Sequence, residues 1–262
     1  MGFLTIQPLW FSGPLLVGLT TLLAMAGPFL VRRRVRLDRL VANNEVAGFK
    51  FAVVGVLYAV LLAFAVIIVW EKFSDAENAV AQEGGAIATL YRLADGIGAE
   101  PGRALRENLT HYAGIAIAED WPAMEHGKAS HAATRALDGV YAALLTFKPD
   151  DGRGTALLAE ALRQLDMVTQ ARRARLVMAT GIVPGVLWFV LVAGAVLTIS
   201  FTLFFGTESL RVQAIMTGVL AFLIVSGLLV IVAIDHPFAG SVKVGPESLA
   251  AVLDDFGGAT RP

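Results

Sequence analysis

The chain has 262 residues, of which 56% are hydrophobic and 16% are charged, and its mean hydropathy is +0.67. Soluble globular domains carry about 25% charged residues, so this composition predicts an integral membrane protein in contact with the lipid bilayer. The formal net charge of -1 excludes the basic surface of a nucleic-acid-binding protein. Because the chain has no cysteine, disulfides and thiolate metal sites are excluded too.

Four apolar segments are long enough to cross a bilayer, which takes about 20 residues of helix. We expect these spans at residues 12–31, 51–70, 182–205 and 212–234. An even number of spans places both termini on the same side of the membrane as the long segment between the second and third spans. The two short connections, at 32–50 and 206–211, lie on the other side.

The connection after the first span is strongly basic. Five arginines fall within eight residues, namely Arg32, Arg33, Arg34, Arg36 and Arg39. Counted over short loops, the positive-inside rule makes this connection cytoplasmic and the long middle segment external.

Two rows of residues run along the second span at helical spacing. Gly55, Ala59 and Ala63 form a small-residue row, which lets another helix approach closely. Beside it lie Val56, Val60 and Phe64. This apolar row fits a lipid-facing surface, a core, or the wall of a pore narrowed by hydrophobic side chains, and periodicity alone does not choose among them.

The segment from residue 71 to 180 mixes both charge signs and is predicted to be an aqueous helical domain. Its first helix continues the second span and carries a bundle seam at Val80, Glu83, Ile87, Leu90, Ala94 and Ile97. After a break at Glu100, Pro101 and Gly102, further helices are expected around 105–116, 137–145 and 157–168. The last of these is expected to run into the third span.

Residues that carry chemistry are sparse, and we expect neither an enzyme nor a metal or cofactor site. Glu107 and His111 have the closest metal-like spacing, without the second motif of a di-iron bundle. The segment Glu119, Asp120, Trp121 and Pro122 has the residue types of a site, but an acidic cap before a Pro in the first helical turn is the favoured interpretation. Asp235 is interpreted as part of a helix stop in interfacial water.

Several short motifs occur around the spans in the order found in a known family. They are residues 44–48, 58–64, 90–92 and 119–124, Trp70 with Glu71, Ala76 with Glu77, the run Arg172, Arg173, Arg175, Trp188, and Asp235 with Pro237, Phe238 and Gly240. Together they resemble the bestrophin-like family of bacterial membrane proteins over residues 43–247.

This resemblance implies a homo-oligomer, with a pentamer favoured, and an ion channel of mostly anion-conducting type. By position, the neck of the pore would be Val56, Val60 and Phe64. If the basic connection faces the axis, Arg32, Arg33, Arg34 and Arg36 would attract permeant anions at its mouth. Residues 239–245 contain no Asp or Glu, so the calcium clasp of animal bestrophins is not implied. Bestrophins also keep the helical domain in the cytosol, opposite to the charge count.

The sequence therefore predicts an all-α, bestrophin-like fold of four transmembrane helices with an extramembrane helical bundle inserted between helices 2 and 3. The expected parts are 1–70, with two spans and the basic loop, 71–180, the helical domain, 181–236, with two spans, and 237–262, a C-terminal tail that begins with a short helix. The expected function is an anion (chloride) channel of the bacterial inner (plasma) membrane. The alternative is a sensor or scaffold that does not transport, whose helical domain binds a ligand or a partner protein.

Overall fold

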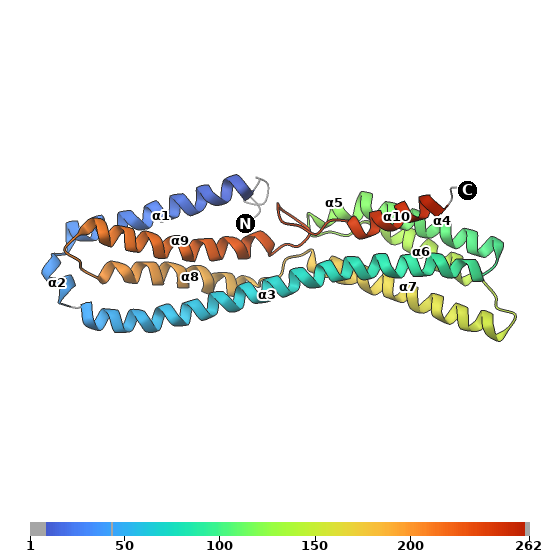
Figure 1. Ribbon diagram of the computed structural model, residues 1–262, viewed down its shortest axis with the longest axis horizontal. Helices are drawn as coiled ribbons and strands as arrows, with labels where there is room; N and C mark the ends of the chain where they lie inside the picture. The colour runs from blue at the N-terminus through green and yellow to red at the C-terminus, as the bar shows by residue number, and fades with distance from the viewer. Residues whose placement is uncertain (1–8, 43, 260–262) are drawn as a thin grey trace. The chain divides into compact units, whose positions relative to one another are not determined.

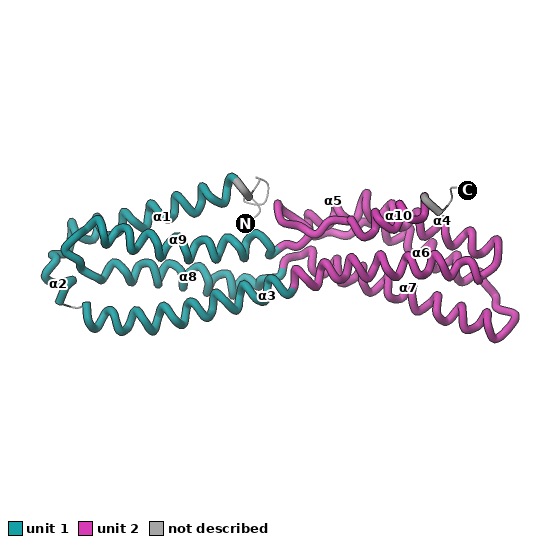
Figure 2. Tube along the Cα trace, in the orientation of Figure 1, with its two compact units in different colours: residues 1–71, 182–235 teal, residues 72–181, 236–262 magenta. Residues whose placement is uncertain are grey.

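The computed structural model describes residues 9–42 and 44–259, which divide into two compact units (Figure 2). Unit 1 comprises residues 1–71 and 182–235, and unit 2 comprises residues 72–181 and 236–262. The described residues form helices joined by short connections and contain no strand, which confirms the all-α prediction.

Unit 1 contains α1 (Leu9–Arg34), the first part of α3 (Asn44–Leu93), α8 (Gly185–Phe201) and α9 (Leu210–Ile234). Each of these helices is long and apolar enough to cross a membrane, so the prediction of four spans is confirmed. The short helix α2 (Leu37–Val41) lies in the basic connection, and the 3-10 turn η3 (Thr202–Phe204) follows α8.

Within unit 1, α8 and α9 lie between α1 and α3 (Figure 1). The first helix packs along α9. Helix α3 is joined to α8, because the Tyr58 hydroxyl of α3 donates a hydrogen bond of 3.1 Å to the Leu191 carbonyl of α8. Tyr58, Ala195 and Ile224 form the core between α3, α8 and α9.

Unit 2 is a helical bundle. It contains the remainder of α3, η1 (Ala94–Gly96), α4 (Ala99–Ile115), the π-helical segment η2 (Ala116–Asp120), α5 (Trp121–Met124), α6 (His131–Leu145), α7 (Gly152–Met178) and α10 (Glu247–Ala259). Two helices begin at side-chain caps, because Ser130 accepts from the Ala132 and Ala133 amides and Asp151 accepts from the Gly154 amide.

The predicted seam of α3 is the core of this bundle. Its six members are all at least 97% buried, namely Val80, Glu83, Ile87, Leu90, Ala94 and Ile97. Helix α3 runs for 50 residues, which confirms that this helix continues the second span, but it ends at Leu93, so Ala94 lies in η1 and Ile97 follows η1. The break after it comes at Gly98, before α4, and Pro101 and Gly102 lie inside α4 rather than at the break.

The prediction that the last bundle helix runs into the third span is wrong. Helix α7 ends at Met178 and α8 begins at Gly185, three residues later than the expected start of the span. Gly181 has a φ of 96°, a conformation that favours glycine, and Pro184 is the N-cap residue of α8. These two residues separate the helices.

The C-terminal segment belongs to unit 2 and is not a separate tail in the part of the chain that the structure describes. Leu249, Val252 and Phe256 of α10 are buried, and the Phe256 ring stacks on Tyr91 of α3 with ring centroids 3.6 Å apart. The end of the expected tail, residues 260–262, lies outside the described residues.

Candidate pore-lining helix and buried polar network

The membrane part of α3 has one face in the core and one face at the surface. Tyr58, Ala65 and Val69 are buried. The three candidate neck residues lie on the exposed face, with 63% of Val56, 49% of Val60 and 61% of Phe64 accessible. This apolar row therefore does not belong to the core of the single chain.

The small-residue row borders the same face. A Cβ atom built on Gly55 would meet no heavy atom within 4 Å, and Ala59 and Ala63 are exposed. Within the described residues, this row therefore packs against no other helix of the chain. Its expected part in close helix packing stays a prediction.

The arginines of the basic connection have different surroundings. Arg32 is partly buried, and its Nη2 donates a hydrogen bond of 2.5 Å to the Thr207 carbonyl. Arg33 and Arg34 are exposed in the last turn of α1. Arg36 forms an exposed ion pair of 3.2 Å with Asp38. Their expected attraction of permeant anions stays a prediction.

The two short connections of unit 1 are joined by an asparagine. The Asn44 Oδ1 atom accepts from the Gly206 amide at 2.9 Å, and its Nδ2 donates to the Gly206 carbonyl at 2.7 Å. A Cβ on Gly206 would lie 2.7 Å from the Leu40 Cβ, so only glycine allows α2 this close to the loop. The motif at 44–48 signalled this region, but the sequence gives no sign of the backbone partner.

Asp235 joins the end of α9 to the segment that precedes α8. Its carboxylate accepts from the Ile182 amide at 3.1 Å, from the Val183 amide at 2.7 Å and from Trp188 Nε1 at 3.4 Å. Only 6% of Asp235 is exposed. The helix stop itself is confirmed, since α9 ends at Ile234 with Asp235 as its C-cap residue. The interfacial-water part of the interpretation is wrong, because the carboxylate is buried and holds the segment that precedes α8.

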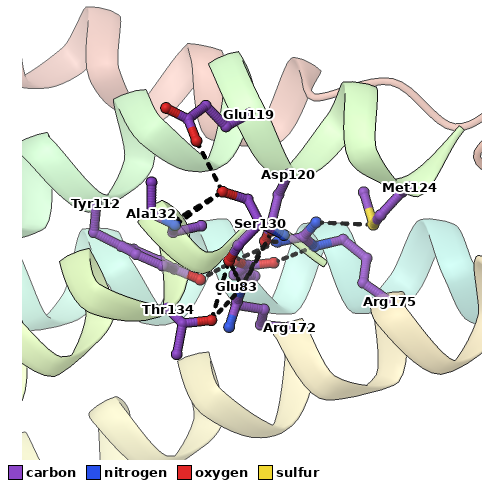
Figure 3. Close-up of polar contacts among 11 residues, drawn as sticks. Glu83, Tyr112, Glu119, Asp120, Met124, Ser130, Ala132, Thr134, Arg172 and Arg175 are labelled. Carbon is purple, nitrogen blue, oxygen red and sulfur yellow. Dashed lines mark hydrogen bonds and ion pairs between the residues drawn. The ribbon is translucent and has the colours of Figure 1, made fainter. Parts of the chain in front are cut away.

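Two buried ion pairs lie at the centre of unit 2 (Figure 3). Arg175 of α7 forms a bidentate pair with Glu83 of α3, with Nε–Oε2 2.7 Å and Nη2–Oε1 3.0 Å. Arg172, one turn earlier, binds Asp120 with Nε–Oδ2 2.7 Å and Nη2–Oδ1 3.1 Å. Arg175 also lies 3.5 Å from Asp120, so the four charges form one balanced cluster.

Neighbouring polar groups complete the hydrogen bonds of the carboxylates. The Tyr112 hydroxyl donates to Glu83 at 2.6 Å, and the Ser130 amide donates to Asp120 at 2.9 Å. Burial, together with the negative charge of Glu83, raises the pKa of Tyr112 well above its ordinary value. Tyr112 therefore stays a neutral donor.

Aromatic and sulfur groups cover the guanidinium of Arg175. Its Cζ atom lies 4.3 Å from the centroid of the Trp121 ring, which is a close cation–π contact. Its Nη1 also lies 3.2 Å from the Met124 sulfur. The Trp121 indole donates to the Val244 carbonyl at 3.2 Å, so the segment after α9 is tied to the same cluster.

The interpretation of Asp120 as a helix cap is wrong. Asp120 makes no capping hydrogen bond, has helical backbone angles and ends the π-helical segment η2. A π turn adds one residue to the helical turn, and here the carboxylate at its end binds Arg172 in the core. Glu119, its neighbour, remains at the surface and accepts from the Ser130 hydroxyl at 2.9 Å.

This network is suited to hold helices together rather than to catalyse a reaction. Each carboxylate is neutralised by an arginine, and none of the cluster's side chains is among the buried groups without a hydrogen-bond partner in the described residues. One signal in the sequence pointed to it, since Glu83 is the charged member of an apolar seam. Its partner, 92 positions away in the chain, gives no comparable signal.

The comparisons with known proteins agree with this fold. The family model for the Bestrophin-like domain matches residues 18–249. A crystal structure of a bacterial bestrophin homologue from Klebsiella pneumoniae, carrying a mutation, has a TM-score of 0.73 at 13% identity and covers 94% of this chain and 99% of its own. Another crystal structure of the Klebsiella pneumoniae homologue has a TM-score of 0.70 at 15% identity, with 93% and 99% covered. No curated protein matches the sequence. The match to the family model, over most of the chain, establishes that this integral membrane protein belongs to the Bestrophin-like family.

Proposed function

We propose that the chain is one subunit of an oligomeric ion channel whose pore is lined by the membrane part of α3. Membership of the Bestrophin-like family and the bestrophin fold support an ion channel. The observation that carries the assignment to α3 is its small-residue row, which no helix among the described residues covers and which leaves room for a neighbouring copy. The apolar row Val56, Val60 and Phe64 lies beside it and is exposed, as apolar residues of α1, α8 and α9 also are.

An oligomer is needed because the described helices of unit 1 enclose no polar path. Tyr58 and its neighbours occupy the space between α3, α8 and α9. The cavity of about 450 Å³ between α1, α8 and α9 has a mostly apolar lining. A polar path must then run between subunits, along the symmetry axis of a closed ring. Gly55, Ala59 and Ala63 permit the close approach of α3 helices from neighbouring copies. The resemblance to bestrophins favours five copies.

In this arrangement, Val56, Val60 and Phe64 from each subunit form an apolar neck. Such a constriction gates conduction by losing its water. The spans themselves carry no Asp, Glu, Lys, Arg or His at 51–70, 185–204 or 212–234. Ion sign is then set by charges outside the spans, and the basic connection at 32–39 favours anions such as chloride. We assign the channel to a bacterial plasma membrane.

Planar-bilayer recording of the purified protein tests the neck. Val60→Ala with Phe64→Ala widens the constriction and is expected to raise conductance or open probability. Val219→Ala with Phe222→Ala is the matched control, because both residues are apolar and exposed on α9, and it should leave currents unchanged. Unaltered currents from the α3 variant of a protein that conducts would contradict the neck assignment.

A groove in unit 2 favours the second candidate function, a sensor. It has a volume of about 860 Å³ and lies along α4 and α10, where Arg103, Arg106 and His111 face the stacked rings of Tyr91 and Phe256. A sensor would bind its ligand here and show no permeation. A ligand screen by thermal shift, with Phe256→Ala as the variant that removes the stacked ring, separates this function from the channel.

A further inference from the structure

The last turn of α1 places arginines where a membrane-spanning helix reaches the membrane surface. Arg33 and Arg34 are exposed, and Arg36 lies two residues after the end of the helix. The two short connections of unit 1, residues 32–50 and 206–211, hold seven Lys or Arg against three Asp or Glu. Positive charge is therefore in excess at this end of the unit.

These arginines come from a different side of unit 1 than the neck row. Helix α1 packs along α9, whereas α3 meets α8 through Tyr58. Figure 1 shows α1 and α3 on opposite sides of α8 and α9. The exposed row Val56, Val60 and Phe64 lies on the face of α3 away from this core. Arg33 and Arg34, in the last turn of α1, are thus separated from the proposed neck on α3 by α8 and α9, whereas Arg36 lies in the connection that leads through α2 to α3.

The basic connection is held in place by the rest of unit 1. Arg32 donates to the Thr207 carbonyl, and Leu40 of α2 is buried against Gly206. Arg36 has one ion-pair partner, Asp38, and both side chains are at least 79% exposed. An exposed pair of this kind contributes little and opens readily. The neighbouring guanidinium groups are therefore presented from a fixed segment.

We propose that Arg33, Arg34 and Arg36 form a binding surface for the headgroups of anionic phospholipids. A guanidinium presents paired N–H donors that match two oxygens of a phosphate. Residues at the end of a membrane span lie at the depth of the headgroup phosphates, which are the most concentrated anions there. Clusters of Lys and Arg beside a span attract such lipids electrostatically. This surface requires Arg33 and Arg34 to face lipid, so it is an alternative to the part that these two arginines have in the proposed ion selectivity.

The test uses the full-length protein in phosphatidylcholine vesicles with spin-labelled phosphatidylglycerol or phosphatidylcholine as a tracer. Electron spin resonance then measures how strongly each lipid associates with the protein. The expected result is a preference for phosphatidylglycerol that Arg33→Gln with Arg34→Gln lowers by roughly fivefold per arginine. The matched control is Arg153→Gln with Arg173→Gln, which removes two exposed arginines of unit 2 and should keep the preference.

Three results would overturn the proposal. The first is an equal preference in wild type and the Arg33/Arg34 variant. The second is displacement of phosphatidylglycerol by millimolar inorganic phosphate, which would identify a site for small anions. The third is a variant that alters chloride selectivity while lipid association stays unchanged, which would assign the arginines to the permeant ion.

Salt dependence and membrane orientation provide further checks. Raising the salt from 0.1 to 1 M shortens the screening length from about 10 to 3 Å, so the preference of the wild-type protein for phosphatidylglycerol should fall. An unchanged preference would contradict the proposal, and this check needs no variant. Because the chain has no cysteine, a single Cys placed at Gly152 reports orientation by labelling with a membrane-impermeant maleimide. The labelled fraction is expected to be the same in the wild-type protein and in the variant with Arg33→Gln and Arg34→Gln.

Discussion

Arg175 and Glu83 form a bidentate ion pair with both side chains fully buried, and it joins helices α7 and α3 in the core of unit 2. Taking both charges out of water is costly, so the pair holds only because Tyr112, Asp120 and Trp121 complete its surroundings. The pair therefore fixes which faces of α3 and α7 meet.

Removing one partner of this pair should destabilise unit 2 strongly. Glu83→Leu leaves the Arg175 charge buried without its main partner, at an expected cost of about 3–5 kcal/mol in the free energy of unfolding. The double variant Glu83→Leu with Arg175→Met should recover most of that loss, because no unpaired charge remains. Chemical denaturation followed by circular dichroism measures both. The surface variant Glu100→Leu is the control and should unfold like wild type, since its pair with Arg103 is exposed. Equal stability of Glu83→Leu and Glu100→Leu would contradict this account.

The raised pKa of Tyr112 predicts a loss of stability in alkaline solution. Above pH 10 the unfolded chain loses the phenol proton while the folded protein keeps it, so the unfolded state binds fewer protons and stability falls as pH rises toward the folded pKa. Tyr112→Phe removes this group and should flatten the decline of the melting temperature between pH 10 and 11. Tyr141→Phe is the control, and it should follow the wild-type decline. A Tyr112→Phe slope as steep as wild type would show that another group titrates.

Substitution of Gly55 should disrupt assembly without harming the fold of the subunit. Among the described residues outside its own helix backbone, no heavy atom lies within 4 Å of a Cβ at this position, so the single chain has room for a side chain there and Gly55→Leu is expected to clash with a neighbouring copy. We expect a smaller oligomer by light scattering in detergent, with the helical content unchanged. Gly18 of α1 has an equally open environment, so Gly18→Leu is the matched control. A full-sized oligomer from the Gly55→Leu chain would exclude this row from the subunit contact.

The link between Asn44 and Gly206 should contribute measurably to the stability of unit 1. Asn44→Ala removes both hydrogen bonds to the Gly206 backbone, and each partly buried group left without a partner costs about 1–3 kcal/mol. The melting temperature should therefore fall, whereas Asn78→Ala, at an exposed site of α3, should leave it near that of wild type. Equal melting temperatures for the two variants would mean that the link is not maintained in the membrane.

Features that depend on composition and local spacing were predictable from the sequence. The four spans follow from the length of the apolar segments, and the seam of α3 follows from its alternating spacing of three and four. The third span was placed three residues too early because Ile182 and Val183 are apolar. Their amides donate to the Asp235 carboxylate, which lies more than fifty positions later in the chain. A hydropathy profile contains no information on such a contact, so it cannot show that these two residues precede the helix.

Pairings between distant polar residues were not predictable in the same way. Asp120 and Pro122 together have the local pattern of a helix start, and only the packed bundle brings Arg172 to the carboxylate. Likewise, Arg172 and Arg175 read as part of a basic run, although both are buried against acids. The neck row is a different case, because its exposure is visible but its role is not. In a single chain, lipid-facing and pore-facing residues are equally exposed.

The central claim, an ion channel formed by several copies of this chain, is tested most directly by ion flux. The purified protein is reconstituted in liposomes with a chloride gradient and then a potassium gradient, and its mass is measured in detergent. This account predicts selective chloride flux from a ring-sized oligomer. Absence of flux from folded, oligomeric protein over a range of pH and calcium would contradict it and would favour the sensor function of unit 2.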